Sequence, residues 1–299
     1  MSEGTENRNG RALEKIIVDK LLNLETVKPT ERCVIQQLRD EPKISELDLE
    51  LKSKFEKSAA EIANFLNEKF QINKQEFYLD RLDDNDDSVV DMVLFNKKER
   101  VSFSIKHNND SLKHNRPYSL IENGLDFKKD SAENIEHRDR LTKICNDFRE
   151  LHPDKKLFSE LSLDTKEKLY EEFTKSCLTS LEKHKNNKEA VANWFKFIMG
   201  LESQYIKIKV FTKKGNSGIF YEDFRDINSF PNKMQLSVNK GERRGKIAAS
   251  WNIVVHFNNG YKFNNRLHNK SSRISDKGQI SMAFDVKFTQ DSVRGINLD

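Results

Sequence analysis

The 299-residue sequence predicts an α+β protein with a β-rich C-terminal part. Three observations support this prediction. Apolar residues recur at helical spacing in residues 11–24, 46–70 and 131–200. Segments rich in Val, Ile and Phe flank a short polar connection at residues 96–99, which predicts an antiparallel hairpin. Apolar and polar residues alternate in several runs from residue 203 onward, as is typical of half-buried strands.

The helices of the middle region carry recognisable end signals. One helix is expected from Asp164 to Leu181, because Asp164 is a suitable N-cap and Glu167 follows three residues later. Another is expected over residues 188–200, because Gly200 is the residue type that most often follows the last turn of a helix.

The last third of the chain reads as strands joined by tight turns. The segment YIKIKVF alternates cleanly, and so does ISMAFDVKF near the C-terminus. The segments WNIVVHF and YKFNNRLH flank Asn259-Gly260, a dipeptide that strongly favours a hairpin turn. We see no internal repeat and no long linker. The sequence therefore predicts a disordered tail and one composite domain: residues 1–10 as the tail, 11–130 with helices and the hairpin, 131–200 helical, and 201–299 basic and β-rich.

The charge of the chain is unevenly distributed. The net charge is +4, but residues 201–299 hold 17 Lys and Arg against 9 Asp and Glu. A locally basic region favours a polyanionic partner such as nucleic acid. A solvated basic surface explains the charge alone equally well.

Several classes of protein lack support in the sequence. No run approaches the ~18 apolar residues of a membrane helix, and the polar N-terminus does not resemble a secretory signal. Cys33, Cys145 and Cys177 have no CxxC spacing, so we expect reduced, buried thiols in a cytoplasmic protein. The seven histidines show no zinc-binding spacing.

The hairpin gathers an acid, a hydroxyl and a lysine. If residues 96–99 form the connection, the two residues that flank it pair with each other. Continuing the pairing along both strands, away from the connection, places Asp91 opposite Ser104. Side chains alternate between faces, so Asp91, Ser104 and Lys106 share one face. The opposite face is apolar and is expected to join the core: Val90, Met92, Leu94, Val101, Phe103 and Ile105.

This combination of side chains suits phosphodiester hydrolysis. A carboxylate can hold Mg²⁺, which binds phosphate oxygens and lowers the pKa of bound water. A neighbouring lysine can position the attacking water or stabilise the developing negative charge. An ordinary half-solvated hairpin with a polar outer face fits the same pattern.

A longer stretch of sequence resembles a known family. Asp91 followed by Ser104-Ile105-Lys106 resembles the PD-(D/E)xK nuclease motif. Together with SIKHN, LKHNRP, FNNGYKFNNRLHNKSSRI and FDVKF, these residues resemble the HaeIII family of type II restriction endonucleases, from GRALEKII to AFDVKF in the same order. The resemblance implies a restriction-endonuclease-like core, with a central mixed sheet flanked by helices. It also implies Mg²⁺-dependent cleavage of double-stranded DNA at a short palindrome such as GGCC, beside a cognate DNA methyltransferase in a restriction–modification system.

The resemblance also assigns roles to individual residues. Asp91 would bind the metal ion and Lys106 would be the catalytic lysine. Ser104 stands where the broader motif has Asp or Glu, which puts the second metal ligand in doubt. Glu14, in the first helix, is the preferred candidate for the missing carboxylate, slightly ahead of Asp86 and Asp87.

Cations that follow the hairpin are candidates for DNA contacts. His107, Lys113, His114 and Arg116 come directly after Lys106 and are expected to contact flanking phosphates, where cations add affinity but little sequence information. Base reading in a G·C site calls for Arg, because Arg bonds guanine with two hydrogen bonds. The candidates lie in the basic third of the chain: Arg243, Arg244, Arg266 and Arg273. The alternative for each of these arginines is a solvated side chain without a role in recognition.

The sequence is also compatible with two other functions. One is a repair nuclease with little sequence preference. The other is a DNA-binding protein on a nuclease-like scaffold without catalysis, which the serine at position 104 keeps open. A palindromic target favours a two-fold homodimer, although no residue in the sequence identifies its interface.

Overall fold

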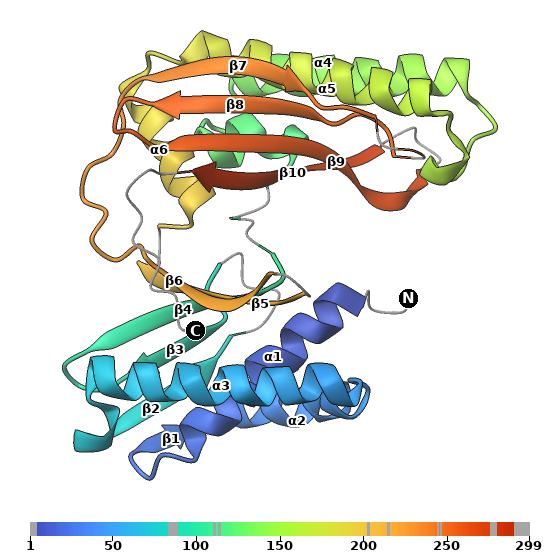
Figure 1. Ribbon diagram of the computed structural model, residues 1–299. Coiled ribbons are helices and arrows are strands. Elements are labelled where there is room, and N and C mark those ends of the chain that lie inside the picture. The colour runs from blue at the N-terminus through green and yellow to red at the C-terminus, as the bar shows by residue number, and fades with distance from the viewer. Residues whose placement is uncertain are drawn as a thin grey trace. The chain divides into compact units, whose positions relative to one another are not determined.

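The computed structural model describes residues 5–82, 89–109, 112, 115–201, 204–213, 216–243, 245, 247–275 and 280–289. Its helices and two sheets confirm the predicted α+β class (Figure 1). The helices are α1 (Thr5–Leu22), α2 (Glu31–Ser45), α3 (Leu49–Phe70), α4 (Ala132–Leu151), α5 (Leu163–His184) and α6 (Lys188–Met199). No helix among the described residues is both long and apolar enough to cross a membrane.

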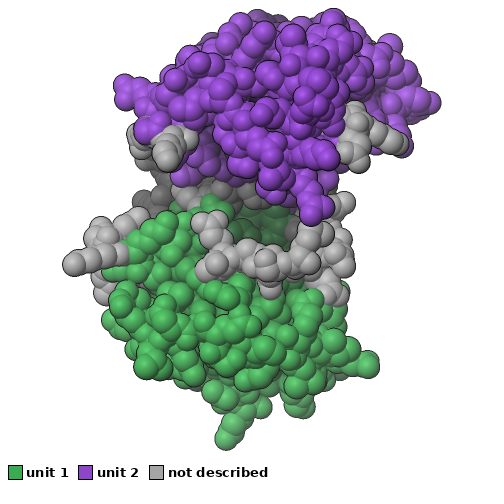
Figure 2. Space-filling view, turned by 90° about the vertical axis from the view of Figure 1, so that its right-hand side faces the viewer, with its two compact units in different colours: residues 1–110, 201–226, 292–299 green, residues 111–200, 227–291 purple. Residues whose placement is uncertain are grey.

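The chain divides into two compact units, coloured separately in Figure 2. The first comprises residues 1–110, 201–226 and 292–299, and the second comprises residues 111–200 and 227–291. The sequence predicted one domain, with residues 201–226 in the C-terminal part. They belong to the first unit instead, because a strand from this segment pairs with the predicted hairpin.

The first unit contains a six-stranded mixed sheet in the order β1-β2-β3-β4-β5-β6. Pairs β1/β2 and β4/β5 are parallel, and the other neighbours are antiparallel. Its strands are β1 (Val27–Pro29), β2 (Phe77–Arg81), β3 (Met92–Phe95), β4 (Arg100–His107), β5 (Tyr205–Lys213) and β6 (Asn216–Asp223).

One face of this sheet forms the core with α1 and α3. The apolar stripes of the two helices, including Leu13, Ile17 and Phe55, are fully buried against strand residues such as Phe103 and Ile208. The predicted helix at 46–70 is thereby confirmed as α3, whose N-cap Asp48 accepts a hydrogen bond from the Leu51 N–H.

Two local expectations for the N-terminal region differ from the structure. Residues 5–10, expected in a disordered tail, form the first turns of α1. The sequence reading also missed α2, which begins at N-cap Thr30 and carries Pro42 inside it. Its buried side chains include Gln36, Gln37 and Asp40, so its core side lacks the apolar spacing that reveals a helix.

The second unit contains a four-stranded antiparallel sheet, along which α4 and α5 run in Figure 1. The predicted Asn259-Gly260 hairpin is confirmed, with Gly260 at φ 89°. Gly200, at φ 66°, ends α6 as predicted. Asp164 does not cap α5: Ser162 does so, two residues earlier, by accepting from the Thr165 N–H at 3.1 Å. The strands are β7 (Met234–Lys240), β8 (Trp251–Phe257), β9 (Lys262–Ile274) and β10 (Ile280–Thr289).

Candidate active site

The hairpin of β3 and β4 has the predicted register. Phe95 pairs with Arg100 and Met92 with Phe103, which places Asp91 opposite Ser104. Asn96 shapes the connection, because its side-chain oxygen accepts hydrogen bonds from the backbone N–H groups of Lys98 and Glu99 at 2.8 and 2.9 Å. The apolar face is buried in the core as expected.

The side chains of Asp91, Ser104 and Lys106 meet at one carboxylate oxygen. Asp91 Oδ2 accepts hydrogen bonds from the Ile105 N–H at 2.6 Å and from Ser104 Oγ at 3.3 Å, and Lys106 Nζ lies 3.4 Å away. Asp91 and Lys106 keep 22% and 27% of their side chains exposed, so a ligand can reach both. Ser104 is only 1% exposed, which makes it a support for Asp91 rather than an open metal ligand.

Glu14 reaches the same region from α1. Burial raises the pKa of Glu14, and the negative charge of Asp91 raises it further, against the opposing effect of Arg81 and Arg11. Two carboxylates whose charges repel each other in this way favour a cation between them. The charge of Asp91 therefore acts on Glu14, the candidate preferred over Asp86 and Asp87 for the missing carboxylate, whose role stays a prediction. Those two aspartates lie outside the described residues.

A buried ion network holds Glu14 in place. Its Oε2 accepts hydrogen bonds from Arg11 at 2.9 Å and from Arg81 at 3.1 Å. Arg81 also contacts Asp40 Oδ2 at 2.7 Å and Gln37 Oε1 at 2.9 Å, and both Arg81 and Asp40 are fully buried. These contacts restrain the Glu14 carboxylate, because rotating it away would remove both hydrogen bonds from a buried site.

The donor set fits a divalent ion only in part. Asp91 and Glu14 supply two carboxylates, which are the ligands that Mg²⁺ prefers. Among the described residues, no group of three or more His, Cys, Asp or Glu side chains is arranged to hold a metal ion. A metal ion here would thus rely on water and on phosphate oxygens for its other ligands, as Mg²⁺ commonly does.

The sequence reading missed charged residues that β5 and β6 bring to the same face. Ser104 pairs with Lys207 and Lys106 pairs with Lys209, so these lysines extend the row of polar side chains. Glu222 of β6 lies 3.6 Å from Lys207 Nζ and forms an ion pair with Lys209. The alternation in YIKIKVF shows that the two lysines share a face, but no sequence signal says that β5 pairs with β4.

His107 does not supply the cation that was expected. It lies on the opposite face of β4 from Lys106, where its ring contacts Phe55 edge-on at 4.7 Å and its Nε2 lies 2.9 Å from Thr212 Oγ1. Burial, with a smaller contribution from the charge of Lys213, lowers the pKa of His107 to about 4. The ring is therefore neutral at pH 7 and is held by protein groups.

The other residues that were predicted to contact DNA lie in the second unit or outside the residues that the structure describes. Lys113, His114 and Arg244 are not among the described residues. Arg243 binds Glu167 at 2.7 Å and Asp164 at 2.6 Å, so it ties its loop to α5. Arg266 pairs with Asp285 across β9 and β10 at 2.7 Å. Arg116 and Arg273 are exposed and line one cavity, which the sequence gave no reason to expect.

Strand β9 presents a basic row on the exposed face of its sheet. Phe263, Asn265 and Leu267 are buried, whereas the alternate residues Lys262 and Arg266 are exposed, as period-two alternation requires. The exposed cations on this face are Lys262, Arg266 and Lys270 of β9 and Lys287 of β10, which we call the basic sheet face. Such a row suits contacts with phosphates.

Comparisons of the chain with protein-family models, with curated proteins and with solved structures found no match. The resemblance to the HaeIII family therefore stays a prediction.

Proposed function

We propose that the chain is a type II restriction endonuclease that cleaves double-stranded DNA at a short palindrome in the presence of Mg²⁺. The observation that carries the proposal is the meeting of Asp91 and Lys106, with 3.4 Å between Oδ2 and Nζ, at the partly exposed end of a hairpin. The resemblance to the HaeIII family adds the substrate class and makes GGCC the first site to test.

Each residue of the site has its own role in the proposed reaction. Asp91 and Glu14 would supply the protein carboxylates that hold Mg²⁺, which when bound would provide an activated water and stabilise charge on the phosphate. Lys106 donates hydrogen bonds from a charged group toward the same place, so it can orient the attacking water or stabilise the pentacovalent phosphate. The Ile105 N–H and Ser104 hydroxyl hold the Asp91 carboxylate still during the reaction.

The second unit supports the DNA-binding half of the proposal. The basic sheet face supplies cations that can contact phosphates, which fix the position of a protein on the duplex. A palindromic substrate is matched by a two-fold homodimer, and a partner methyltransferase of the same specificity would protect the host DNA.

A second candidate function is DNA binding without cleavage. It is favoured by Ser104, which replaces a metal-binding acid of the broader motif and is buried against Asp91.

Digestion of plasmid DNA separates the candidates. The wild-type protein is incubated with plasmid in Mg²⁺ and in EDTA, beside Asp91→Asn, which removes the charge but keeps an oxygen that accepts from the Ile105 N–H. We expect discrete fragments in Mg²⁺ alone, and none from Asp91→Asn. The sequence of the fragment ends gives the recognition site. A smear indicates a nuclease of low specificity, and retarded but uncut DNA indicates pure binding.

A further inference from the structure

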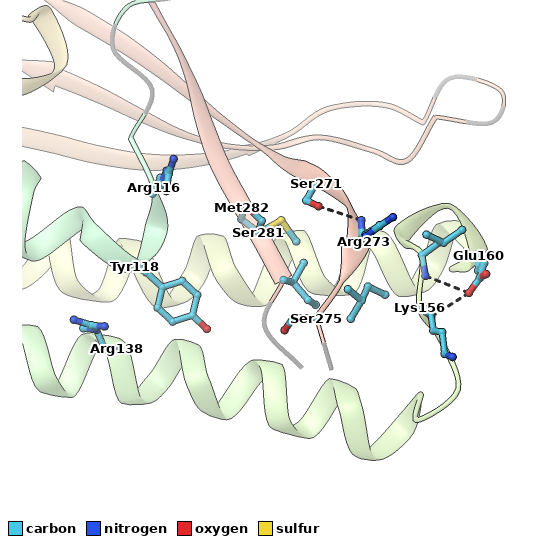
Figure 3. A pocket seen from close by; sticks show the side chains of 13 residues that line it. Arg116, Tyr118, Arg138, Lys156, Glu160, Ser271, Arg273, Ser275, Ser281 and Met282 are labelled. Carbon is cyan, nitrogen blue, oxygen red and sulfur yellow. Dashed lines mark hydrogen bonds between the residues drawn. The ribbon is translucent and has the colours of Figure 1, made fainter. Parts of the chain in front are cut away.

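The second unit contains a large cavity that the proposed cleavage reaction does not use. It has a volume of about 1020 Å³ and lies between the ends of β9 and β10, helix α4 and the segments around Tyr118 and Glu160 (Figure 3). Pockets for small organic ligands typically occupy about 300–1,000 Å³. This cavity is therefore large enough for a molecule the size of a nucleotide and far larger than a single phosphate ion requires.

Cations from four separate segments line the cavity. Arg116, Arg138, Lys156 and Arg273 all contribute to its wall, against the single acid Glu160. In Figure 3, Arg138 lies on one side of the cavity beside Tyr118, whereas Arg273 and Lys156 lie on the other. Cations converging from opposite walls create a concave positive surface, which attracts a ligand with several negative charges.

The described residues neutralise little of this charge. The side chains of Arg116, Lys156 and Arg273 make no hydrogen bond or ion pair with another described residue, and Arg138 lies 3.8 Å from Glu122. Glu160 directs its Oε2 to the backbone N–H groups of Lys156 and Leu157, at 3.2 and 3.3 Å, rather than to a cation.

The crowding of cations also affects a neighbouring lysine. Burial lowers the pKa of Lys270, and the positive charge of Arg116 lowers it further. Burial and a neighbouring positive charge both disfavour the charged form of a lysine. The charges of Arg116 and Lys270 therefore repel each other, and a bound anion would relieve this repulsion.

Another part of the cavity wall is apolar. It is formed by one aromatic ring, Tyr118, and by aliphatic or thioether side chains: Leu157, Ile274, Ile280 and Met282. The Tyr118 hydroxyl lies 3.2 Å from Cys145 Sγ, so its polar end is already engaged and its ring is the part offered to a ligand. A flat, apolar group can stack or pack here while charged groups on the same ligand meet the cations.

From this combination we propose that the cavity binds a nucleotide, with its phosphates against Arg116, Lys156 and Arg273 and its base against the apolar wall. The nucleotide comes either from solution or from a DNA strand, since both present the same base and phosphate chemistry. The proposal does not rest on the nuclease function, because the cavity lies wholly within the second unit and its occupation is measured without cleavage.

Calorimetric titration of the full-length protein tests the proposal. The probes are ATP, inorganic triphosphate and adenosine, each at low salt. We expect ATP to saturate one site per chain, triphosphate to bind more weakly and adenosine more weakly still, because each lacks half of the recognised chemistry. A 5′-phosphorylated oligonucleotide is then used as a competitor: displacement of ATP assigns the site to DNA, and a lack of displacement assigns it to free nucleotides.

Two variants test whether ATP binds in the cavity. Arg273→Ala removes a charge and should weaken ATP binding at least about tenfold, the loss that one charge-assisted hydrogen bond to phosphate represents. Ser281→Trp adds bulk to the cavity from an exposed position without changing charge, and should block ATP as well.

Matched controls exclude a general effect of charge. Lys128→Ala removes an exposed cation of the same unit outside the cavity, and Asp91→Asn changes the first unit; neither should alter ATP binding. Absence of saturable ATP binding overturns the proposal. So does equal binding by wild type, Arg273→Ala and Ser281→Trp, all with wild-type circular dichroism.

Discussion

The two units use charged residues in opposite ways. In the first unit, several charged residues are buried and paired: Arg81 and Asp40 are 0% exposed and Lys207 is 1% exposed. In the second unit, the cations of the basic sheet face and of the cavity lie at open positions, and the Arg266 side chain is 56% exposed although it pairs with Asp285. Buried pairs fix geometry at a cost in desolvation, whereas exposed cations stay available to a partner. The first arrangement suits chemistry at a fixed point, and the second suits binding of a polyanion.

Removal of Arg81 should produce the largest effect on stability. Arg81→Met leaves Asp40 and Glu14 with less compensation in a buried site, so we expect the first unit to lose about 3–5 kcal/mol of unfolding free energy. Both tryptophans, Trp194 and Trp251, lie in the second unit. Urea denaturation followed by tryptophan fluorescence therefore reports the second unit, and circular dichroism reports both.

We expect Arg81→Met to move the circular dichroism transition to lower urea and to leave the fluorescence transition in place. Arg266→Met is the matched control, because it removes an exposed cation. It should shift neither the circular dichroism transition nor the fluorescence transition by a measurable amount. If Arg81→Met leaves both transitions unchanged, the buried network does not stabilise the first unit and the contrast between the units fails.

Loss of Lys106 should affect cleavage without affecting stability. Lys106→Ala removes a charged donor from the proposed reaction centre, which is expected to lower the rate of DNA cleavage by about 10²–10³-fold. The urea midpoint should stay at the wild-type value, because the side chain is partly exposed and its single ion pair is worth little.

The control for Lys106 is Lys97→Ala, at the exposed connection of the same hairpin. It should cleave at the wild-type rate and bind DNA normally. A Lys106→Ala protein as active as Lys97→Ala would remove the lysine from the mechanism, even if DNA binding and Mg²⁺ dependence were otherwise intact.

The buried ring of His107 should make the first unit sensitive to acid. Its pKa is about 4 in the folded protein against about 6.5 in an unfolded chain, so between these values the unfolded state binds more protons. The free energy of unfolding should therefore fall as pH drops from 6.5 to 4, by about 1–2 kcal/mol after allowance for partial exposure of the ring.

Urea denaturation at a series of pH values measures this loss, with His107→Gln as the comparison. The variant should be less stable at pH 7.5 but should lose less stability across the same pH range. If the unfolding free energies of the two proteins fall in parallel as the pH drops, a group other than His107 titrates in this pH range.

Substitution of an exposed cation should have the smallest effect on the unfolding free energy. Arg266→Gln breaks one exposed ion pair and is expected to change the unfolding free energy by less than about 1 kcal/mol. If Arg266 contacts a phosphate, the same change should reduce the slope of log affinity against log salt by about 1 for all DNA sequences.

Fluorescence anisotropy at several salt concentrations distinguishes the two roles of Arg266. A loss of about 1–3 kcal/mol for GGCC alone, with an unchanged salt slope, would make it a base-reading residue instead. An unchanged affinity and slope for every sequence would assign it only to the pair with Asp285.

Local patterns in the sequence determined several parts of this protein by themselves. The register of Asp91 against Ser104 follows from strand alternation and a short polar connection, both contained in residues 90–107. The end of α6 at Gly200 and the turn at Gly260 are equally local, because each depends on backbone angles that glycine adopts without strain. Interactions between near neighbours in the chain fix these features, so a short stretch of sequence is enough to reveal them.

Only the tertiary structure decided which distant segments share a site. It paired β5 with β4 and so placed Lys209 beside Lys106, it directed Arg81 toward Glu14, and it placed Arg116 with Arg273 in the second unit, although Arg116 follows Lys106 by ten residues. The pairing partner of a strand and the destination of a loop depend on how all apolar faces of the chain are buried together. That information is spread over the whole sequence, and no single motif contains it.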